Sequence, residues 1–534
     1  MPPNEPPEAG YPAPGTLRPA ATALLLALTA ALLLFRLGRV PLIGPDEPRY
    51  ARVAVEMHRS GARVTPTLQG RPWLEKPPLY YWLAGAAFSL LGETETAARL
   101  PSVAAALLLV GATALCGARL HGGGAGLHAG FVAATAPLAF IYGRAAAMDM
   151  LLAATVTAAV GLIALRLLGI AGRLAVPAAW LFMALATLAK GPLGFILPGL
   201  IVAGYIAATR EWRQARTVLS PAGIGLFLLG AGPWHALIWH DQGRAFVDVF
   251  LLNHNLQRFT STIHRHGGPI LYYVPVLLLG LFPWSGLLLP AFAKARPRRS
   301  RADLFVLLWA AVPFVLFSIA GSKLPGYVLP CLPPLALLVG RAAHEMVRRE
   351  LRSPFGAGPR AAAVVTLLLA CVLAGAPLVL RRLGEPDWRL LVPVSLWGLL
   401  VGVGFRLRVE RDPAGALGLL RVGAAGTLVL LTLAAPPILA RRESGRSLFA
   451  RAAGREVLAW GAWRTAWMAG YFYNDGKVRE VAGEEEIAAA AAAGPVLVLC
   501  GPGERRRLEA APGLSAALVA EGPRSSALLR VRRR

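Results

Sequence analysis

The sequence predicts an all-α polytopic membrane protein of about thirteen transmembrane helices, followed by a small extracytoplasmic α/β domain. Three observations lead to this prediction. Of 534 residues, 56% are hydrophobic and only 16% are charged, whereas a soluble protein carries about 25% charged residues. Apolar runs as long as a bilayer span recur from Ala21 to Ala440. The stretch 441–534 is less apolar and contains turn and strand signals instead.

The N-terminus is predicted to be a disordered cytoplasmic segment over residues 1–19, because it is rich in proline and glycine. The apolar run that follows continues through Phe35 and Leu37, and no convincing cleavage site precedes the polar segment 44–52. A secretory signal peptide needs such a site. We therefore interpret this run as a retained first transmembrane helix.

Apolar segments of suitable length divide residues 20–440 into thirteen predicted spans. They lie near 20–38, 100–118, 124–142, 150–167, 174–189, 192–208, 219–238, 270–290, 303–320, 326–340, 361–380, 389–405 and 414–440.

One further apolar segment, 77–91, has only about 15 residues, against roughly 20 for a span. The positive-inside rule decides how it is placed. If it is an interfacial helix and the N-terminus is inside, the basic loops 210–216, 294–301 and 341–352 all fall on the cytoplasmic side. Counting it as a span would move all three loops outside.

This topology places the loops 39–99 and 240–269 and the domain 441–534 on the outside. Within that domain, residues 496–499 are expected to form a strand, and a helix is expected after Gly503. A few arginines near span ends are exceptions to the rule, because they also fall outside: Arg381, Arg382, Arg389, Arg441 and Arg442.

The net charge of +26 would suggest a nucleic-acid partner in a soluble protein. Here most arginines occupy short loops between apolar runs, as expected where charge sets membrane topology. No basic stripe interleaved with aromatic residues is present, so nucleic acid is excluded as a partner. The four cysteines, Cys116, Cys331, Cys371 and Cys500, show neither metal-ligand spacing nor a disulfide framework.

Two adjacent carboxylates, Asp46 and Glu47, follow the first span and precede Pro48 and Arg49. One interpretation is structural, with Asp46 as a helix N-cap and Pro48 in the first turn. A carboxylate held at a membrane surface beside an arginine can also serve as a general base. Asp46 and Glu47 are therefore candidate catalytic residues, and Arg49 is a candidate ligand for an anion.

The same loop ends with Glu75 and Lys76, directly before two prolines and an aromatic cluster. The aromatic residues are typical of a helix in the headgroup layer, but they do not account for the Glu–Lys pair. Asp149 begins a later helix among apolar neighbours. A charge there is costly unless it is paired or lies at the rim, so it is a functional candidate, with N-capping as the alternative.

Cations also gather on the outside face. Lys190 joins two spans almost without a loop, and Lys323 belongs to a turn that ends with Tyr327. With Arg49 and Lys76 they place four cations on one membrane surface. Snorkelling is the alternative interpretation for Lys190. Converging cations near the headgroups favour a phosphate or diphosphate ligand.

The outer loop 253–269 contains His254 and Arg258 among three histidines and two arginines. Such a stretch suits either a metal ion or a phosphate. The spacing matches no metal motif, so both interpretations stay open.

Together these motifs resemble those of the aminoarabinose transferase and protein mannosyltransferase family, GT-C-fold enzymes that take sugar from a polyprenyl-phosphate carrier. The motifs occur in family order over residues 20–340. They are Asp46-Glu47-Pro48-Arg49-Tyr50, Glu75-Lys76-Pro77-Pro78, Arg99-Leu100-Pro101-Ser102, Met148-Asp149, Lys190-Gly191-Pro192, Asn255-Leu256-Gln257-Arg258-Phe259 and Ser322-Lys323-Leu324-Pro325-Gly326-Tyr327. The resemblance implies a GT-C membrane domain over 20–440.

The resemblance also implies roles for individual residues. Asp46 is expected to be the main catalytic carboxylate and Asp149 a second acid in the same cavity. The carrier phosphate is expected to bind Lys76, Lys190, Arg258 and Lys323, with Tyr327. Glu75, with His254, is expected to contribute to a divalent metal site if there is one, although this sequence has Asn255 where relatives place a histidine.

The expected reaction is sugar transfer from a polyprenyl-phosphate donor on the extracytoplasmic face of the plasma (inner) membrane. A lipid A-like glycolipid and protein Ser/Thr are the acceptors considered. A transporter or flippase is a rival from another class, but the sequence shows neither inverted repeats nor paired broken helices. A non-catalytic scaffold is a second rival, and it would not need the acids and cations gathered on one face.

Overall fold

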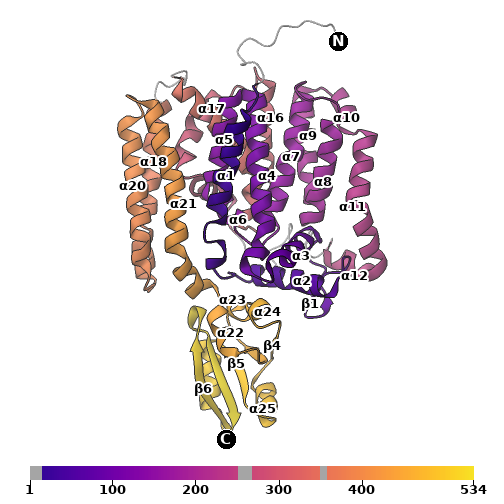
Figure 1. Cartoon of the computed structure of the whole chain (residues 1–534), viewed down its shortest axis with the longest axis vertical. Helices are drawn as coiled ribbons and strands as arrows, with labels where there is room; N and C mark the ends of the chain where they lie inside the picture. Colours follow the sequence, from indigo (N-terminus) through magenta and orange to yellow (C-terminus); the bar gives the residue numbers. More distant parts are fainter. Residues whose placement is uncertain (1–14, 251–267, 349–357) are drawn as a thin grey trace.

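The computed structural model describes residues 15–250, 268–348 and 358–534. His254 and Arg258, two of the predicted site residues, lie outside the described residues. A bundle of helices forms one part of the molecule, and a smaller domain with a β-sheet lies at one end of it (Figure 1). The predicted combination of a helical membrane protein with a small C-terminal α/β domain is therefore confirmed.

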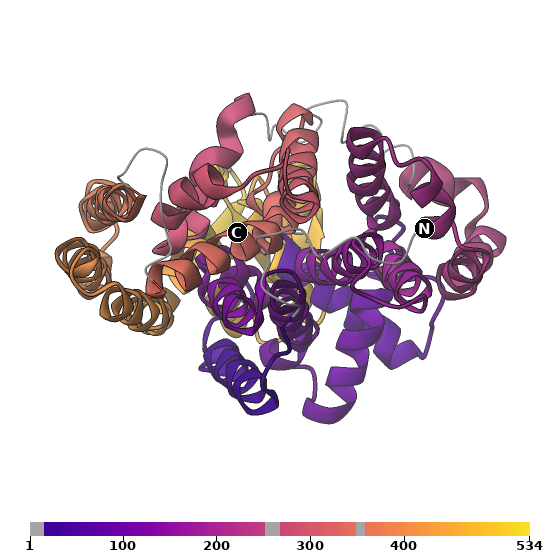
Figure 2. The ribbon, with the colours of Figure 1, turned by 90° about the horizontal axis from the view of Figure 1, so that it is seen from above.

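The helices of the bundle are mostly apolar, and the longer ones run between its two ends. They are α1 (Pro19–Leu34), α4 (Glu95–His121), α5 (Gly123–Thr135), α6 (Pro137–Gly143), α7 (Asp149–Leu167), α8 (Ala175–Lys190), α9 (Leu193–Thr209), α11 (Pro221–Gln242), α14 (Tyr273–Gly280), α15 (Leu288–Lys294), α16 (Arg301–Ile319), α17 (Leu332–Val347), α18 (Gly358–Ala374), α19 (Ala376–Arg382), α20 (Val392–Arg408) and α21 (Pro413–Glu443). Figure 2 shows α18, α20 and α21 together at one edge of the bundle.

Shorter elements connect these helices. They are α2 (Asp46–Ser60), α3 (Leu79–Leu91), α10 (Arg213–Val218), α12 (Arg244–Phe246) and the hairpin of β1 (Thr67–Leu68) and β2 (Arg71–Pro72). Figure 1 shows α2, α3 and β1 at the end of the bundle that carries the C-terminal domain.

Within the described residues, nine helices are long and apolar enough to cross a membrane, and two bent helix pairs pass the same test together. Each of the thirteen predicted spans coincides with one of the nine, with a bent pair, or with the shorter helices α8 and α9. Only α3 remains, and its 13 residues reach about 20 Å, short of a bilayer core of about 30 Å. The number of crossings stays a prediction.

The bent pairs correct the sequence interpretation, which found no broken helices. The α5–α6 pair bends by 61°, and the pair Ile270–Gly280 and Trp284–Lys294 bends by 113°. At the first bend Ala136 is extended and precedes Pro137. A proline lacks an N–H and keeps the residue before it out of the helical region, so the chain breaks there.

The described parts of the three basic loops that were predicted to be cytoplasmic, 210–216, 294–301 and 341–348, lie at one end of the bundle. Arg301 forms an ion pair with Glu211 at 2.6 Å, and Lys294 forms one with Glu345 at 2.5 Å, so contacts tie the loops to one another. Figure 1 places α10, which belongs to the first of these loops, at the end opposite the C-terminal domain.

Some of the exceptional arginines at the other end have acidic partners. Arg441 lies 2.9 Å from a carboxylate oxygen of Asp387, and Arg442 lies 3.7 Å from one of Glu385. The positive-inside rule counts lysine and arginine and not net charge, so these residues remain exceptions to it despite their acidic partners.

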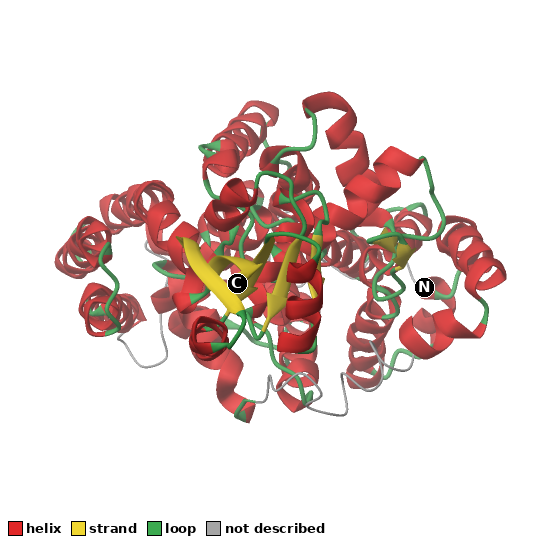
Figure 3. Ribbon diagram, turned by 90° about the horizontal axis from the view of Figure 1, so that it is seen from below, coloured by secondary structure: helices red, strands yellow, loops and turns green. Residues whose placement is uncertain are grey.

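The C-terminal domain has a five-stranded sheet with the order β4-β3-β5-β7-β6, parallel across β4, β3 and β5 and antiparallel across β5, β7 and β6. Figure 3 shows this sheet below the middle of the bundle. Its strands are β3 (Val457–Trp460), β4 (Val478–Glu480), β5 (Val496–Cys500), β6 (Leu514–Glu521) and β7 (Ala527–Arg533). Its helices are α22 (Arg446–Ala452), α23 (Arg464–Met468), α24 (Gly470–Tyr473), α25 (Glu484–Ala492) and α26 (Pro502–Ala510).

The predicted strand and helix of this domain are confirmed as β5 and α26. The domain is fixed to the helices beneath the bundle by polar contacts. The Oδ1 atom of Asp475 accepts hydrogen bonds from Arg52 at 2.5 Å and Arg59 at 2.7 Å, both on α2. The Gln69 side chain donates to the Val478 carbonyl at 2.7 Å. These contacts place the sheet domain directly against the loop that carries the first candidate site residues.

Candidate active site

Asp46 is the first residue of α2, and the preceding residue, Pro45, makes no side-chain capping bond. The Asp46 carboxylate instead forms an ion pair with Arg49, three residues later and so on the same face of the helix. The Asp46 side chain is 49% exposed, whereas that of Arg49 is 10% exposed. The N-cap interpretation of Asp46 was therefore wrong, and its carboxylate is held by a fixed cation while remaining accessible.

Arg49 lies at the meeting point of α2 and the segment before α3. Its Cζ atom is 5.3 Å from the centroid of the Trp73 ring, a cation–π arrangement. Burial lowers the pKa of Arg49, because it disfavours the charged form. Electrostatic interactions with Tyr50, Asp46 and Glu75 outweigh this effect, so the pKa of Arg49 is raised above its ordinary value. Glu75 therefore lies close enough to contribute to the charge balance of this site.

Glu47 occupies a different environment, because its carboxylate is buried and fully engaged. One oxygen accepts hydrogen bonds from Arg99 Nε at 3.1 Å and Ala146 N at 2.6 Å. The other accepts from Arg99 Nη2 and from Ile43 N, both at 2.8 Å. A carboxylate with four donors has little capacity left to accept a proton from a substrate. This geometry favours a positioning role for Glu47 over the catalytic role expected from the sequence.

The Arg99–Ser102 motif connects α4 to the segment before α7. Arg99 is connected to the segment before α7 through Glu47, which accepts hydrogen bonds from both Arg99 and the Ala146 N–H. The Ser102 hydroxyl donates to the Ala147 carbonyl at 3.0 Å. Asp149, the first residue of α7, follows two residues later. The same network therefore positions the starts of α2 and α7, and with them two candidate carboxylates.

Asp149 is paired with Lys190, as a charge in an apolar setting requires. The Lys190 Nζ atom lies 2.6 Å from Asp149 Oδ1, and it also lies 4.9 Å from the centroid of the Tyr327 ring. Met148 occupies the cap position of α7, so the capping alternative for Asp149 was wrong. Three motifs from distant parts of the chain thus meet in one cluster.

Lys323 is buried, and its ammonium donates to the Ala320 carbonyl at 2.7 Å. An ammonium group has three N–H donors, so this contact orients the side chain without using all of them. Lys76 is half-buried beside Glu75 at the start of the interfacial segment. Both cations therefore lie in structured segments that border the carboxylate clusters.

The metal interpretation receives little support from the geometry. Across residues 15–250, 268–348 and 358–534, no group of three His, Cys, Asp or Glu side chains is arranged to hold a metal ion. Glu75 lies beside the guanidinium of Arg49, whose positive charge opposes a bound cation. A metal role for Glu75 with His254 stays a prediction.

The contacts between Arg49 and aromatic residues were not predicted from the sequence. Trp73 Nε1 donates to the Tyr81 hydroxyl at 3.0 Å, which fixes the indole over which Arg49 lies. Tyr471 of the C-terminal domain also lies near Arg49. Burial raises the pKa of Tyr471, and the positive charge of Arg49 acts against that rise, which requires the two side chains to be close. The Trp73–Tyr81 cluster was visible as an interfacial signal, but nothing in the sequence indicated that Tyr471 docks beside it.

Comparison with known proteins adds a family context. The family model for dolichyl-phosphate-mannose-protein mannosyltransferase matches residues 75–239. The chain is 30% identical over 397 residues to undecaprenyl phosphate-alpha-4-amino-4-deoxy-L-arabinose arabinosyl transferase 2 of Proteus mirabilis, covering 71% of this chain and 70% of that protein. The corresponding transferase of Pseudomonas aeruginosa is 32% identical over 367 residues, covering 67% of this chain and 65% of its own length.

Solved structures give the same likeness at the level of the fold. ArnT from Cupriavidus metallidurans in the apo state superposes with a TM-score of 0.81 at 23% identity, covering 96% of this chain and 98% of that chain. The same protein bound to undecaprenyl phosphate gives a TM-score of 0.79 at 24% identity, with the same coverage. At this identity the likeness shows a shared fold over nearly the whole chain.

Proposed function

Since the chain belongs to the family of undecaprenyl phosphate-α-4-amino-4-deoxy-L-arabinose arabinosyl transferases, we propose that it transfers a sugar from an undecaprenyl-phosphate-linked donor to a lipid A-like glycolipid. The resemblance predicted from the sequence motifs is thereby confirmed. The transferases named above act, by their names, on a sugar carried by undecaprenyl phosphate. The donor proposed here is of that class.

The observation that carries the proposal is the pairing of two carboxylates with cations at the starts of α2 and α7. Asp46 is accessible beside Arg49, and Asp149 is held by Lys190. The Glu47 carboxylate joins the two helix starts through the Ala146 N–H. Acids and cations at one end of the bundle suit a lipid-borne substrate whose phosphate stays in the headgroup layer.

In the proposed reaction, an oxygen of the acceptor forms a bond with the anomeric carbon of the donor sugar. The bond between that carbon and the phosphate oxygen breaks, and undecaprenyl phosphate leaves with the electron pair. If the acceptor oxygen belongs to a hydroxyl group, its proton passes to the Asp46 carboxylate, which acts as general base. The transition state resembles an oxocarbenium ion, so the carboxylate of Asp149, the second acidic residue of the site, stabilises the positive charge that develops on the sugar.

Cations around this site are proposed to hold the donor phosphate. Lys76, Lys190 and Lys323, with Tyr327, are assigned this role, and Arg258 completes the set from outside the described residues. They stabilise the negative charge that the departing phosphate keeps as the glycosidic bond breaks.

The active site and C-terminal domain are proposed to face outward from the inner membrane. The basic loops tied together at the other end of the bundle support this orientation. Reporter fusions after Ala293 and after Arg451 are expected to report opposite sides of the membrane, the first cytoplasmic and the second extracytoplasmic. Fusions that report the same side would contradict this orientation.

The function is tested with purified protein in lipid nanodiscs, supplied with undecaprenyl-phosphate aminoarabinose and radiolabelled lipid A. We expect the label to shift to a sugar-modified lipid. A second arm supplies a polyprenyl-phosphate mannose and a Ser/Thr peptide, because the mannosyltransferase family model matches residues 75–239. Transfer to the peptide and not to lipid A would replace the proposed acceptor, and no transfer in either arm would contradict the proposal.

A further inference from the structure

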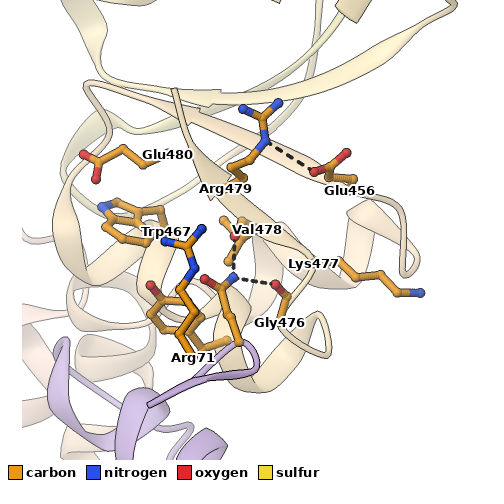
Figure 4. Close-up of a pocket in the computed structure, with 10 residues that line it drawn as sticks. Arg71, Glu456, Trp467, Gly476, Lys477, Val478, Arg479 and Glu480 are labelled. Atoms are coloured by element: carbon orange, nitrogen blue, oxygen red, sulfur yellow. Dashed lines mark hydrogen bonds and ion pairs between the residues drawn. The ribbon is translucent and has the colours of Figure 1, made fainter. Parts of the chain in front are cut away.

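A cavity of about 540 Å³ lies where the β1–β2 hairpin meets the C-terminal domain (Figure 4). The hairpin contributes Arg71 to its lining, and the domain contributes Trp467, Tyr471, Lys477 and Glu480. Figure 4 shows the Arg71 side chain rising from the hairpin toward the domain. None of these residues belongs to the carboxylate and lysine clusters described above.

The cavity combines three kinds of chemistry. Among the described residues, no acidic side chain pairs with Arg71 or Lys477, whereas the nearby Arg479 is paired with Glu486 at 3.1 Å and with Glu456 at 3.6 Å. Two cations of the lining are therefore available to an anion. Trp467 adds an aromatic ring that is half-buried, and Glu480 adds an exposed carboxylate.

We propose that this cavity binds the phosphorylated sugar headgroup of the acceptor glycolipid, an assignment that rests on the proposed function. The fork of the Arg71 guanidinium matches a phosphate group geometrically, and Lys477 adds a point charge at the rim. A carboxylate is an acceptor only, so Glu480 suits the hydroxyl donors of a sugar. The indole of Trp467 offers a broad apolar face with one polar N–H.

The charge pattern distinguishes this ligand from an acidic peptide. A polyanionic chain would meet the exposed carboxylate of Glu480 as well as the cations, whereas Glu456, also in the lining, is paired with Arg479. A sugar phosphate presents its charge at one point and hydroxyl groups elsewhere, so it matches cations and carboxylates together. Pockets of this kind fix orientation with a few placed polar groups.

Two observations place the cavity near the carboxylate site. Arg71 lies two residues before Trp73, the ring over which Arg49 is placed. Tyr471 lines the cavity, and it lies close enough to Arg49 for the positive charge of Arg49 to act against the rise that burial causes in its pKa. A headgroup bound here would bring another part of the same acceptor toward Asp46, the ion-pair partner of Arg49.

Binding is tested on the full-length protein in nanodiscs with D-glucosamine 1-phosphate, inorganic phosphate and D-glucosamine as separate probes. Ligand-observed NMR gives each dissociation constant. We expect the sugar phosphate to bind more tightly than either single group, and Arg71→Gln to weaken it at least roughly 10-fold. Arg507→Gln, an exposed arginine on α26, is the matched control and should leave binding unchanged.

Several outcomes would overturn the assignment. They are equal affinity for inorganic phosphate and the sugar phosphate, no binding of any probe, tighter binding of a polyglutamate peptide, or an unaltered dissociation constant in Arg71→Gln. Donor affinity, measured with undecaprenyl phosphate, should be the same in Arg71→Gln and the wild type, which shows that the variant is folded.

Turnover separates this inference from the proposed function. With lipid A as acceptor, Arg71→Gln should raise the acceptor KM about 10-fold while kcat and the donor KM stay unchanged. With dephosphorylated lipid A as acceptor, the variant and the wild type should have the same acceptor KM. Normal turnover with an unchanged acceptor KM would refute the headgroup site and leave the transferase intact. If no glycolipid is modified, the proposed function fails, and the sugar-phosphate binding experiment alone decides the inference.

Discussion

Arg99 and Glu47 form a buried ion pair in which the guanidinium donates to both carboxylate oxygens, at 2.8 and 3.1 Å. Arg99 also donates to backbone carbonyls of the segment between α1 and α2, namely those of Leu37, Val40 and Pro41. Because Glu47 accepts the Ala146 N–H as well, one pair joins α4, the start of α2 and the segment before α7.

Removing one partner of this pair should destabilise the protein strongly. Arg99→Leu leaves the Glu47 carboxylate buried without its cation, which typically costs about 3–5 kcal/mol. The double variant Arg99→Leu with Glu47→Leu should lose less stability than the sum of the two single variants. Thermal unfolding of the detergent-purified proteins measures these changes, with Arg507→Leu as the exposed control. Additive losses would show that the two side chains are not coupled.

Gly326 leaves no space for a side chain beside the Asp149 cluster. A Cβ atom there would lie 2.6 Å from a ring carbon of Tyr142 and 2.8 Å from Asp149 Oδ1. Gly326→Ala should therefore displace the carboxylate from Lys190 and reduce kcat, at a stability cost of about 1–3 kcal/mol. Gly225→Ala is the matched control, because no atom outside the nearby backbone of its own helix lies within 4 Å of its Cβ position.

The activity of these two glycine variants is compared at saturating donor, together with their unfolding temperatures. Equal kcat values for Gly326→Ala and Gly225→Ala would mean that the position of the Asp149 carboxylate does not limit the reaction.

Donor binding should depend on the lysines that border the carboxylates. Lys76→Ala and Lys323→Ala each remove a cation expected to bind the carrier phosphate, and loss of a charge-assisted hydrogen bond costs about 1.5–3 kcal/mol. The affinity for undecaprenyl phosphate is the measurement, with Arg507→Ala as the control. Unchanged affinity in both lysine variants, with unaltered unfolding temperatures, would remove the two residues from the donor site.

The fold was predictable from the sequence to the extent that it depends on local composition. Apolar runs of span length mark helices wherever they occur, so each predicted span coincides with a helix or a helix pair. The bends were missed because an apolar run keeps its composition through a break such as that at Pro137. The first bend arises from the extended backbone at one residue, Ala136. The mean hydropathy of a window of residues does not show such a change.

The candidate site was predictable where a charge stood out in an apolar setting. Asp149 and Lys190 were each found as isolated charges, and the structure pairs them. The role of Arg99 was not predictable, although its motif was recognised, because its partner Glu47 lies 52 residues away. Tyr471 gave no signal for the same reason, since only the docking of the C-terminal domain brings it to Arg49.

Docking of the C-terminal domain should weaken in acid. Burial acts to raise the pKa of Asp475, but hydrogen bonds from Arg52 and Arg59 outweigh it and lower that pKa below its ordinary value of 3.8. A group with a lowered folded pKa stabilises the folded state above its unfolded pKa and loses this effect as the pH falls through the folded value. The docking contact should therefore weaken progressively as the pH falls below 3.8 and through the lower pKa of folded Asp475.

Hydrogen exchange of the residues around Asp475 as a function of pH measures this effect. Asp475→Asn should show faster exchange than the wild type at neutral pH and a smaller change on acidification. A wild-type acid transition that persists unaltered in Asp475→Asn would assign it to other carboxylates.

Asp46→Asn should abolish sugar transfer while the protein still inserts and binds its donor. The carboxylate is 49% exposed and paired with Arg49, so it is accessible to a substrate and held in position by the guanidinium. Asparagine keeps the shape, and the structure shows no capping bond from this side chain that the substitution would disturb.

Loss of one proton-transfer group costs roughly 10²–10⁴-fold in rate. Single-turnover assays with bound donor measure the chemical step, and undecaprenyl phosphate affinity serves as the folding control. Asp46→Glu tests whether a carboxylate suffices, since it retains the charge and shifts its position by one methylene. Near-normal turnover by Asp46→Asn would transfer the role of general base to Asp149, the other carboxylate positioned through the Glu47 network, and Asp149→Asn would then be the inactive variant.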